Sequence, residues 1–281
     1  MRTAAQNAEL ALLLEVAGTP KPGNVDRHRD FDDLRFEHFL AGAVGSSEGL
    51  RAAERGDPVG EAFEQSVAGM ADQRGGNTQF GALLLLVPLV RAASTRKLTR
   101  DDAAAVAEET TVDDAAGFYR AFDHVDVFVD DPPEDADDLD ARRGSDAIPA
   151  VESRNLTLYD LMTMSAPEDG NAVEWAEGFP RSFAVADRIA ADDGPIPDRI
   201  AAAFLDQLAE YPDSLVAKQH GLATAEEVAA RAAELRDASA SCEELDAFGD
   251  DLVSRGVNPG TTADIVAAGT FVALERDEVV V

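Results

Sequence analysis

The sequence predicts an all-α fold, a single compact domain of about ten helices over residues 1–281. Three observations support this prediction: apolar residues recur at helical spacing, alanine is abundant, and runs of alternating polar and apolar residues are few. Two short valine-rich patches, 125–129 and 279–281, are predicted as strands. With 281 residues, 45% of them hydrophobic, the chain can bury a large core.

The helical stripes follow one another along the chain. Phe36, Leu40 and Val44 lie at i, i+4 and i+8, and similar stripes recur in 200–211 and 245–252. The apolar run 82–90 predicts a buried helix, because it is far shorter than the roughly 20 residues that a membrane helix needs. Three pairs resemble capping boxes and predict helix starts: Thr224 with Glu227, Ser241 with Glu244, and Thr261 with Asp264.

The charge balance restricts the possible partners. The formal net charge is −31, which opposes binding to nucleic-acid phosphates. An acidic surface with only three lysines, at positions 21, 97 and 218, is typical of a protein that works in concentrated salt. The lone Cys242 and the lack of a leader-like N-terminus predict a cytoplasmic protein without a membrane partner, and a homodimer is plausible.

The stretch TPKPGNVDRHRDFDD, residues 19–33, departs most clearly from plain helix composition. Pro20, Pro22 and Gly23 exclude a regular helix and predict a rigid turn before a charged run. This turn places basic residues and aspartates on one loop, beside the start of a helix.

Three further segments combine turn residues with helix-start signals. They are RGGNTQFG at 74–81, YPDSLVAKQHG at 211–221 and NPGTTADIVAAG at 258–269. Free amide groups at such helix starts suit a phosphate, and Lys218 adds a compact cation. Each segment is equally well explained as an ordinary turn with a good cap.

Two acidic segments invite a metal interpretation. The adjacent Asp113 and Asp114 can share Mg²⁺ beside a phosphate site. The stretch 123–140 holds nine carboxylates and no lysine or arginine, but Pro132 and Pro133 and irregular spacing favour a solvated surface loop without a catalytic role. The chain has no P-loop, no GxGxxG, no GxSxG and no zinc-ligand spacing.

Taken together, PKPGNVDRHRDFDD, GGNTQFGALLLL, YPDSLVAKQHG and NPGTTADIVAAG resemble the triphosphoribosyl-dephospho-CoA synthase family, in the family's order, from about residue 20 to residue 270. The resemblance implies that the chain replaces the adenine of ATP by the ribose 2′-hydroxyl of dephospho-CoA. Such a displacement needs a proton acceptor, stabilisation of positive charge at the anomeric carbon, and Mg²⁺ with cations for the triphosphate.

The residues of the four motifs receive hypothetical roles on this basis. The predicted catalytic residues are Asp26, His28 and Asp30, with Asp26 or His28 as the base. The predicted Mg²⁺ ligands are Asp30, Asp114, Asp213 and Asp264. The predicted phosphate- and nucleotide-binding residues are Lys21, Arg27, Gly75, Gly76, Asn77, Thr78, Lys218, Asn258, Gly260, Thr261 and Thr262.

Two other functions stay open at this point. A nucleotide ribosyl transferase or glycosidic-bond hydrolase on the same fold would use another acceptor, such as water, because fold alone does not specify a substrate. A salt-adapted helical binding protein would use the four turns only as caps, and would bind neither ATP nor Mg²⁺.

Overall fold

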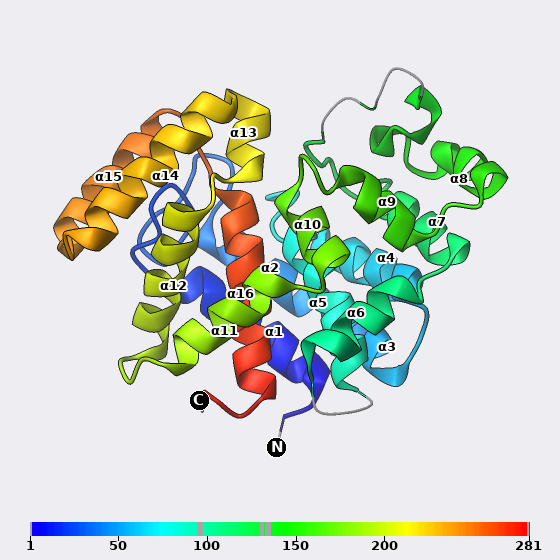
Figure 1. Ribbon diagram of the computed structural model, residues 1–281, viewed down its shortest axis with the longest axis horizontal. Helices are drawn as coiled ribbons and strands as arrows, with labels where there is room; N and C mark the ends of the chain where they lie inside the picture. The colour runs from blue at the N-terminus through cyan, green and yellow to red at the C-terminus, as the bar shows by residue number, and fades with distance from the viewer. Residues whose placement is uncertain (1, 95–97, 130–131, 133–135, 280) are drawn as a thin grey trace.

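The computed structural model confirms the all-α prediction. It describes residues 2–94, 98–129, 132, 136–279 and 281, and within these residues Figure 1 shows packed helices and no strand. The helices outnumber the ten predicted, since several are only about two turns long. Residues 126–129, predicted as part of a strand, have no regular structure, and residue 280 of the second predicted strand lies outside the described residues. The first helices are α1 (Ala4–Ala17), α2 (Phe36–Gly45), α3 (Ser47–Arg55), α4 (Val59–Met70), α5 (Phe80–Ala93), α6 (Arg100–Glu108) and α7 (Val112–Ala121).

The second part of the chain begins with two short 3-10 segments and ends in the longest helices. Figure 1 shows α16 in the middle of the molecule, with α12 to α15 on one side and α3 to α9 on the other. The elements are η1 (Asp137–Leu139), η2 (Ala141–Ala147), α8 (Ile148–Arg154), α9 (Leu158–Ser165), α10 (Gly170–Glu177), α11 (Pro180–Ala190), α12 (Ile196–Glu210), α13 (Ser214–His220), α14 (Leu222–Asp237), α15 (Cys242–Ser254) and α16 (Gly260–Glu275).

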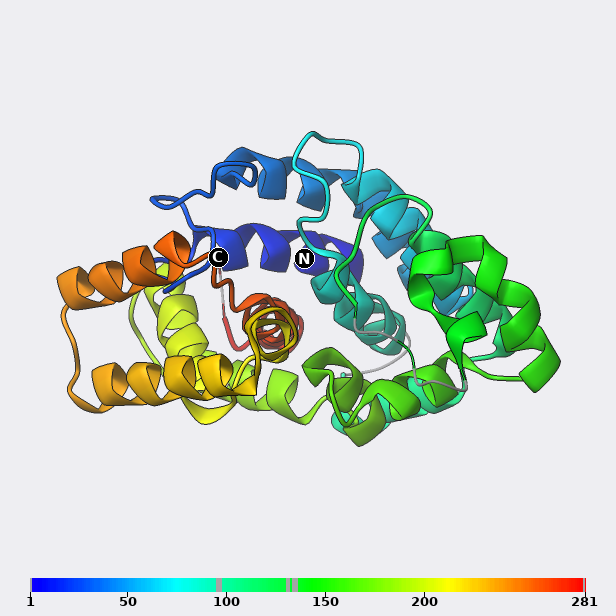
Figure 2. The same ribbon diagram turned by 90° about the horizontal axis from the view of Figure 1, so that it is seen from above.

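The core is built around α16 and α5, which are apolar on nearly every side. A helix with this pattern is stable only when other helices surround it. Helix α16 packs against α1, α11, α12 and α5, and Figure 2 shows it enclosed by these neighbours. The apolar run 82–90 lies within α5 and is buried throughout, as predicted. Among the described helices, none is both long and apolar enough to cross a membrane.

Helix starts account for most differences from the sequence prediction. Ser241 and Glu244 form the predicted capping box of α15. Thr224 and Thr261 were wrongly predicted as caps, because α14 begins at Leu222 and α16 at Gly260, so both threonines lie inside the first turn. In each case a glycine or proline just upstream already turns the chain.

The predicted rigid turn forms the connection between α1 and α2. Gly23 has a φ of +76°, which favours glycine, and a side chain there would collide with Leu252 of α15. The connection therefore packs directly against α15, two segments that are more than 200 residues apart in the sequence.

Candidate active site

A cavity of about 640 Å³ lies between the two halves of the chain. This volume is within the roughly 300–1,000 Å³ typical of small-molecule sites. Its walls come from the starts of α5, α10 and α16, from α7, α9 and α13, and from residues 126–129 and 139–141. Segments distant in sequence thus meet around one space.

One end of this cavity, which we call the polar end, is formed by helix starts. Asn77 Oδ1 accepts a hydrogen bond of 3.1 Å from the Phe80 amide and caps α5. Asp169 Oδ1 accepts from the amides of Asn171 and Ala172, at 2.8 and 3.0 Å, and caps α10. Gly260 and Thr261 contribute the start of α16. The positive ends of three helix dipoles are therefore directed toward this end, an arrangement that favours anions.

A lysine–aspartate pair lies in the wall of the polar end. Lys218 Nζ donates to Asp169 Oδ2 at 2.6 Å, and the lysine side chain is only 12% exposed. Lys218 is the one basic side chain among the described residues that line the cavity, whereas five carboxylates line it. Those carboxylates are Asp126, Asp140, Glu168, Asp169 and Asp264.

A second pair joins α10 to α16. Asn171 Nδ2 donates to Asp264 Oδ2 at 2.9 Å. Burial raises the pKa of the Asp264 carboxyl well above its usual range; the hydrogen bond from Asn171 opposes this, and the nearby carboxylates, Asp213 first among them, raise it further. The site therefore favours a bound proton or a bound cation at this carboxyl.

Two details show how closely this pair is fitted. A side chain at Gly81, in the first turn of α5, would collide with both Asp264 and Asn171, so only glycine fits there. Asn171 Oδ1 is buried and has no hydrogen-bond partner among the described residues. A buried acceptor without a partner is costly in a folded protein, and it is a common feature of ligand sites.

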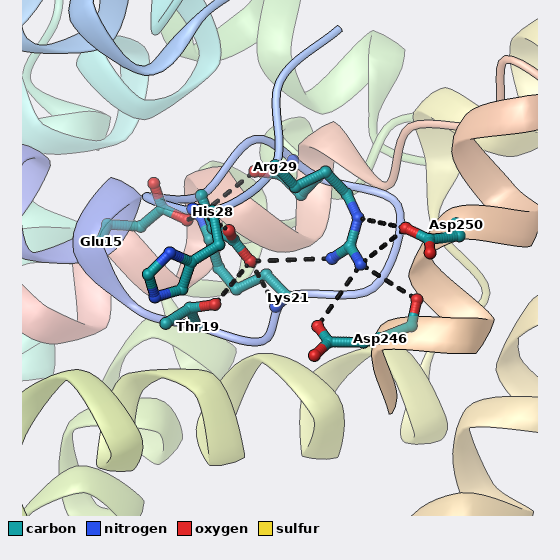
Figure 3. A network of polar contacts seen from close by, with 9 residues as sticks. Glu15, Thr19, Lys21, His28, Arg29, Asp246 and Asp250 are labelled. Atoms are coloured by element: carbon teal, nitrogen blue, oxygen red, sulfur yellow. Dashed lines mark hydrogen bonds and ion pairs between the residues drawn. The ribbon is translucent and has the colours of Figure 1, made fainter. Parts of the chain in front are cut away.

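The polar side chains of the charged loop, residues 19–33, bond mainly to one another and to neighbouring helices, and of this loop only Asn24 lines the cavity. Asp26 is buried and accepts from the Thr19 hydroxyl at 2.9 Å, from the Lys21 amide at 3.1 Å and from the His28 amide at 2.8 Å. Arg29 extends from the same loop to Asp246 and Asp250 of α15, as Figure 3 shows.

Lys21, predicted as a phosphate ligand, is fully buried beneath this loop. Its ammonium group pairs with Glu15 of α1 and donates to Asn24 Oδ1 at 3.1 Å (Figure 3). Asn24 in turn donates to Asn258 Oδ1 at 2.9 Å, and these two asparagines do line the cavity. The loop thus supports the cavity wall from behind.

The remaining predicted residues of the loop lie at the surface. Arg27, His28 and Asp30 are exposed and do not line the cavity. Asp30 Oδ1 accepts from the Phe36 amide at 2.7 Å and so caps α2. Gly75 and Gly76 form the turn before α5 without lining the cavity, whereas the next two residues, Asn77 and Thr78, do line it.

Two predicted metal ligands serve as helix clamps. Asp114 accepts from the amides of Gly60 and Thr111, both at 2.8 Å, and forms the capping box of α7. Asp213 caps α13 and accepts from the Thr262 amide and hydroxyl, both at 2.7 Å. Neither lines the cavity, and neither does Thr262. Within the described part of the chain, no three His, Cys, Asp or Glu side chains are arranged to hold a metal ion.

The structure brings together seven of the predicted residues and adds others that the sequence analysis missed. Those that line the cavity are Asn77, Thr78, Lys218, Asn258, Gly260, Thr261 and Asp264. Asp169 and Asn171 were missed, although PEDGN at 167–171 carries the same signal of proline, glycine and a capping aspartate as the other motifs.

The interpretation of 123–140 as a solvated surface loop is incomplete, because several of its described residues line the cavity. Its lack of a catalytic role stays a prediction. Asp126 to Val129, Pro132, Ala136, Leu139 and Asp140 all line the cavity. The stretch can line a cavity despite its charge because apolar residues lie between the aspartates. The apolar side chains contact the cavity, while most carboxylates face water. Residues 130–131 and 133–135 of this stretch lie outside the described residues.

Comparison with known proteins agrees with this geometry. No curated protein matches the chain. A crystal structure described as that of a candidate triphosphoribosyl-dephospho-CoA synthase from Archaeoglobus fulgidus matches with a TM-score of 0.69 and 24% sequence identity, over 84% of this chain and 98% of that one. This likeness concerns the fold. The model of the ATP:dephospho-CoA triphosphoribosyl transferase family, CitG, matches residues 1–280, and the chain therefore belongs to that family.

Proposed function

We propose that the cavity is the active site in which this chain transfers the triphosphoribosyl group of ATP to the ribose 2′-hydroxyl of dephospho-CoA and releases adenine. The observation that carries the proposal is the meeting of three helix starts, Lys218 and the Asn171–Asp264 pair at one end of one cavity. Anion-binding groups and a carboxylate are both needed, because ATP carries a triphosphate and positive charge develops at the anomeric carbon of its ribose.

The polar end would bind the triphosphate. Backbone amides at the starts of α5 and α16 offer hydrogen bonds to phosphate oxygens, and Lys218 offers a charge. Asp169 holds the lysine at 2.6 Å, so the ammonium group is positioned before the substrate arrives. The predicted phosphate ligands Lys21 and Arg27 have no part in this arrangement.

The residues of the polar end also fit Mg²⁺. Five carboxylates against one lysine leave the lining negative, so a triphosphate needs additional cations. Asp264 and the unpartnered Oδ1 of Asn171 supply the oxygen ligands that Mg²⁺ prefers, with phosphate oxygens and water completing the shell. When bound, the ion would neutralise charge on the triphosphate.

In the transfer, the 2′-oxygen of the acceptor bonds to C1′ of the ATP ribose and the acceptor hydroxyl gives up its proton. The bond from C1′ to adenine N9 breaks, and adenine leaves with the electron pair and takes up a proton. The positive charge that develops at C1′ is stabilised by the carboxylates of the lining. Asp140 pairs with Arg142, Asp169 with Lys218 and Asp264 with Asn171, which leaves Asp126 and Glu168 as proton acceptors in the lining. We assign the proton to Glu168, because it directly precedes Asp169 of the polar end in the sequence.

Product analysis tests this function. The purified chain is incubated with ATP and Mg²⁺ in molar KCl, with and without dephospho-CoA, and the products are identified by mass spectrometry. We expect adenine and triphosphoribosyl-dephospho-CoA in equal amounts, and only when the acceptor is present. Adenine released equally fast without dephospho-CoA would indicate hydrolysis and contradict the proposal.

A further inference from the structure

The lining contributed by α7, α9 and residues 126–129 has a different chemistry from that contributed by α13 and α16, and Figure 1 shows α7 and α9 on the opposite side of α16 from α13. We call the first of these the apolar end of the cavity, and it is lined by Phe80, Phe118, Phe122, Phe128, Leu161, Met162 and Met164. The rings of Phe80, Phe118 and Phe122 pack edge to face, with centroids 4.9–6.4 Å apart, and form a continuous wall. None of these side chains carries a charge or a strong hydrogen-bonding group.

This wall suits a long flexible chain, whose few polar groups can turn toward water, better than a rigid purine. The ring nitrogens and amino group of adenine need partners when they leave water, and unpaired they are costly. The Tyr119 hydroxyl, which lies nearby, already donates to the Leu139 carbonyl at 2.6 Å. Methionine side chains, in contrast, adapt to irregular apolar chains and to sulfur.

The apolar end also extends to the surface of the molecule. Phe128 and Met164 are 51% and 53% exposed, and they belong to the small set of large apolar side chains that are exposed in the described residues. Both line the cavity. Exposed apolar side chains gathered at the edge of a cavity indicate a surface that a ligand covers.

We propose that the apolar end binds the pantetheine arm of the acceptor. This inference rests on the proposed function, because it takes dephospho-CoA as the acceptor. Dephospho-CoA has a polar end, with ribose and diphosphate, and a long uncharged arm that contains two amide groups and one hydroxyl group between apolar segments and ends in a thiol. The cavity has the same division, so the acceptor ribose lies beside the polar end while the arm runs along the phenylalanine wall toward Phe128 and Met164.

The arm then distinguishes the acceptor from the donor. ATP has the same nucleoside as dephospho-CoA but no arm, so only the acceptor gains the contacts of the apolar end. The described part of 123–140, through Val127 and Phe128, thereby contributes to acceptor selection.

Steady-state kinetics of Phe128→Ser and Met164→Ser test the assignment. Both side chains are half-exposed, so the variants should fold. We expect each to raise KM for dephospho-CoA by about fivefold or more, because an apolar contact worth a few methylene groups is lost, with kcat and KM for ATP unchanged. Leu222→Ser is the matched control, since Leu222 is 60% exposed and does not line the cavity.

A binding measurement keeps the test independent of turnover. Calorimetric titration with 4′-phosphopantetheine should show binding to the wild type and to Leu222→Ser that weakens in Phe128→Ser and Met164→Ser. If the two cavity variants bind 4′-phosphopantetheine as the wild type does, or if they raise KM for ATP instead, the assignment is wrong. Absence of adenine release in the wild type with intact 4′-phosphopantetheine binding would contradict the proposed reaction, but not the arm site.

Discussion

Two clusters of buried charge, one in the loop between α1 and α2 and one at the polar end of the cavity, differ in how completely their polar atoms are paired. In the loop, each oxygen of Asp26 accepts at least one hydrogen bond, and Lys21 is paired with Glu15. At the polar end, Asn171 Oδ1 has no partner among the described residues, and Asp264 has a strongly raised pKa.

The difference shows which cluster is built for a ligand. A fully paired network gains nothing from a substrate and serves mainly to fix the chain, whereas an incompletely paired one is costly until a ligand completes it. We therefore expect substitutions in the first cluster to change the free energy of unfolding, and substitutions in the second to change turnover.

Asp264→Asn should give the largest effect. We expect turnover to fall by at least about a hundredfold, on the order of 2.7 kcal/mol of barrier, because the carboxylate that we propose as a Mg²⁺ ligand is lost. Thermal stability without Mg²⁺ should not fall at neutral pH. The folded-state pKa of Asp264 is raised above its unfolded value, so its contribution to stability is present at low pH and is lost as pH rises through the folded pKa. Asparagine stays neutral and avoids this loss.

The predicted pH dependence of stability is checked by the melting temperatures of wild type and Asp264→Asn, measured in metal-free buffer between pH 4 and pH 8. The two curves should be similar at the acid end, and the variant should become the more stable protein as pH rises. A variant that is less stable than the wild type at pH 8, or one that keeps wild-type turnover, would place Asp264 with the structural aspartates.

Asp26→Asn should give the opposite result. The substitution removes the charge that faces Arg29 and weakens the acceptors for Thr19 and the Lys21 amide, all in a buried setting. We expect a loss of about 2 kcal/mol in the free energy of unfolding. Urea titration in molar KCl measures it, and kcat at low temperature should stay within about twofold of the wild type. A selective loss of kcat at unchanged stability would restore Asp26 to the catalytic residues.

Lys218→Ala should reduce kcat/KM for ATP by about tenfold, or about 1.4 kcal/mol, because it removes the positive charge that we propose contacts the triphosphate. Arg231→Ala is a suitable control, since Arg231 is an exposed residue that pairs with Glu234 on its own helix and does not line the cavity. Equal kinetics for the two variants would remove Lys218 from the phosphate site.

The helices were predictable because their periodicity and caps are local properties of the chain. The buried helix at 82–90 and the cap at Ser241 follow from a few neighbouring residues, and the structure confirms them. The predicted strand at 125–129 does not form, because valine content alone does not make a strand and no other strand exists among the described residues to pair with it.

Only part of the site was predictable, because its geometry depends on contacts between helices that are distant in the sequence. Each motif places polar side chains at a helix start, but whether they face the core, the solvent or the cavity depends on packing between distant helices. Lys21 and Lys218 are equally rare lysines in turn-rich segments, yet one is paired with Glu15 beneath a loop and the other lines the cavity. The prediction for 123–140 rested on its carboxylates and left out the apolar residues between them, several of which line the cavity.

Asp30→Ala should give the smallest effect and gives the most sensitive comparison of the two clusters. Its carboxylate caps α2 through the Phe36 amide at 2.7 Å, at an exposed position outside the cavity. We expect a loss of about 1 kcal/mol in the free energy of unfolding, the usual value of a helix cap, and unchanged kinetics for both substrates. Asp30→Asn, which keeps an acceptor oxygen at the same position but no charge, should recover most of that stability. If both variants were stable and inactive, the carboxylate itself would be needed in the reaction, and the loop would belong to the active site.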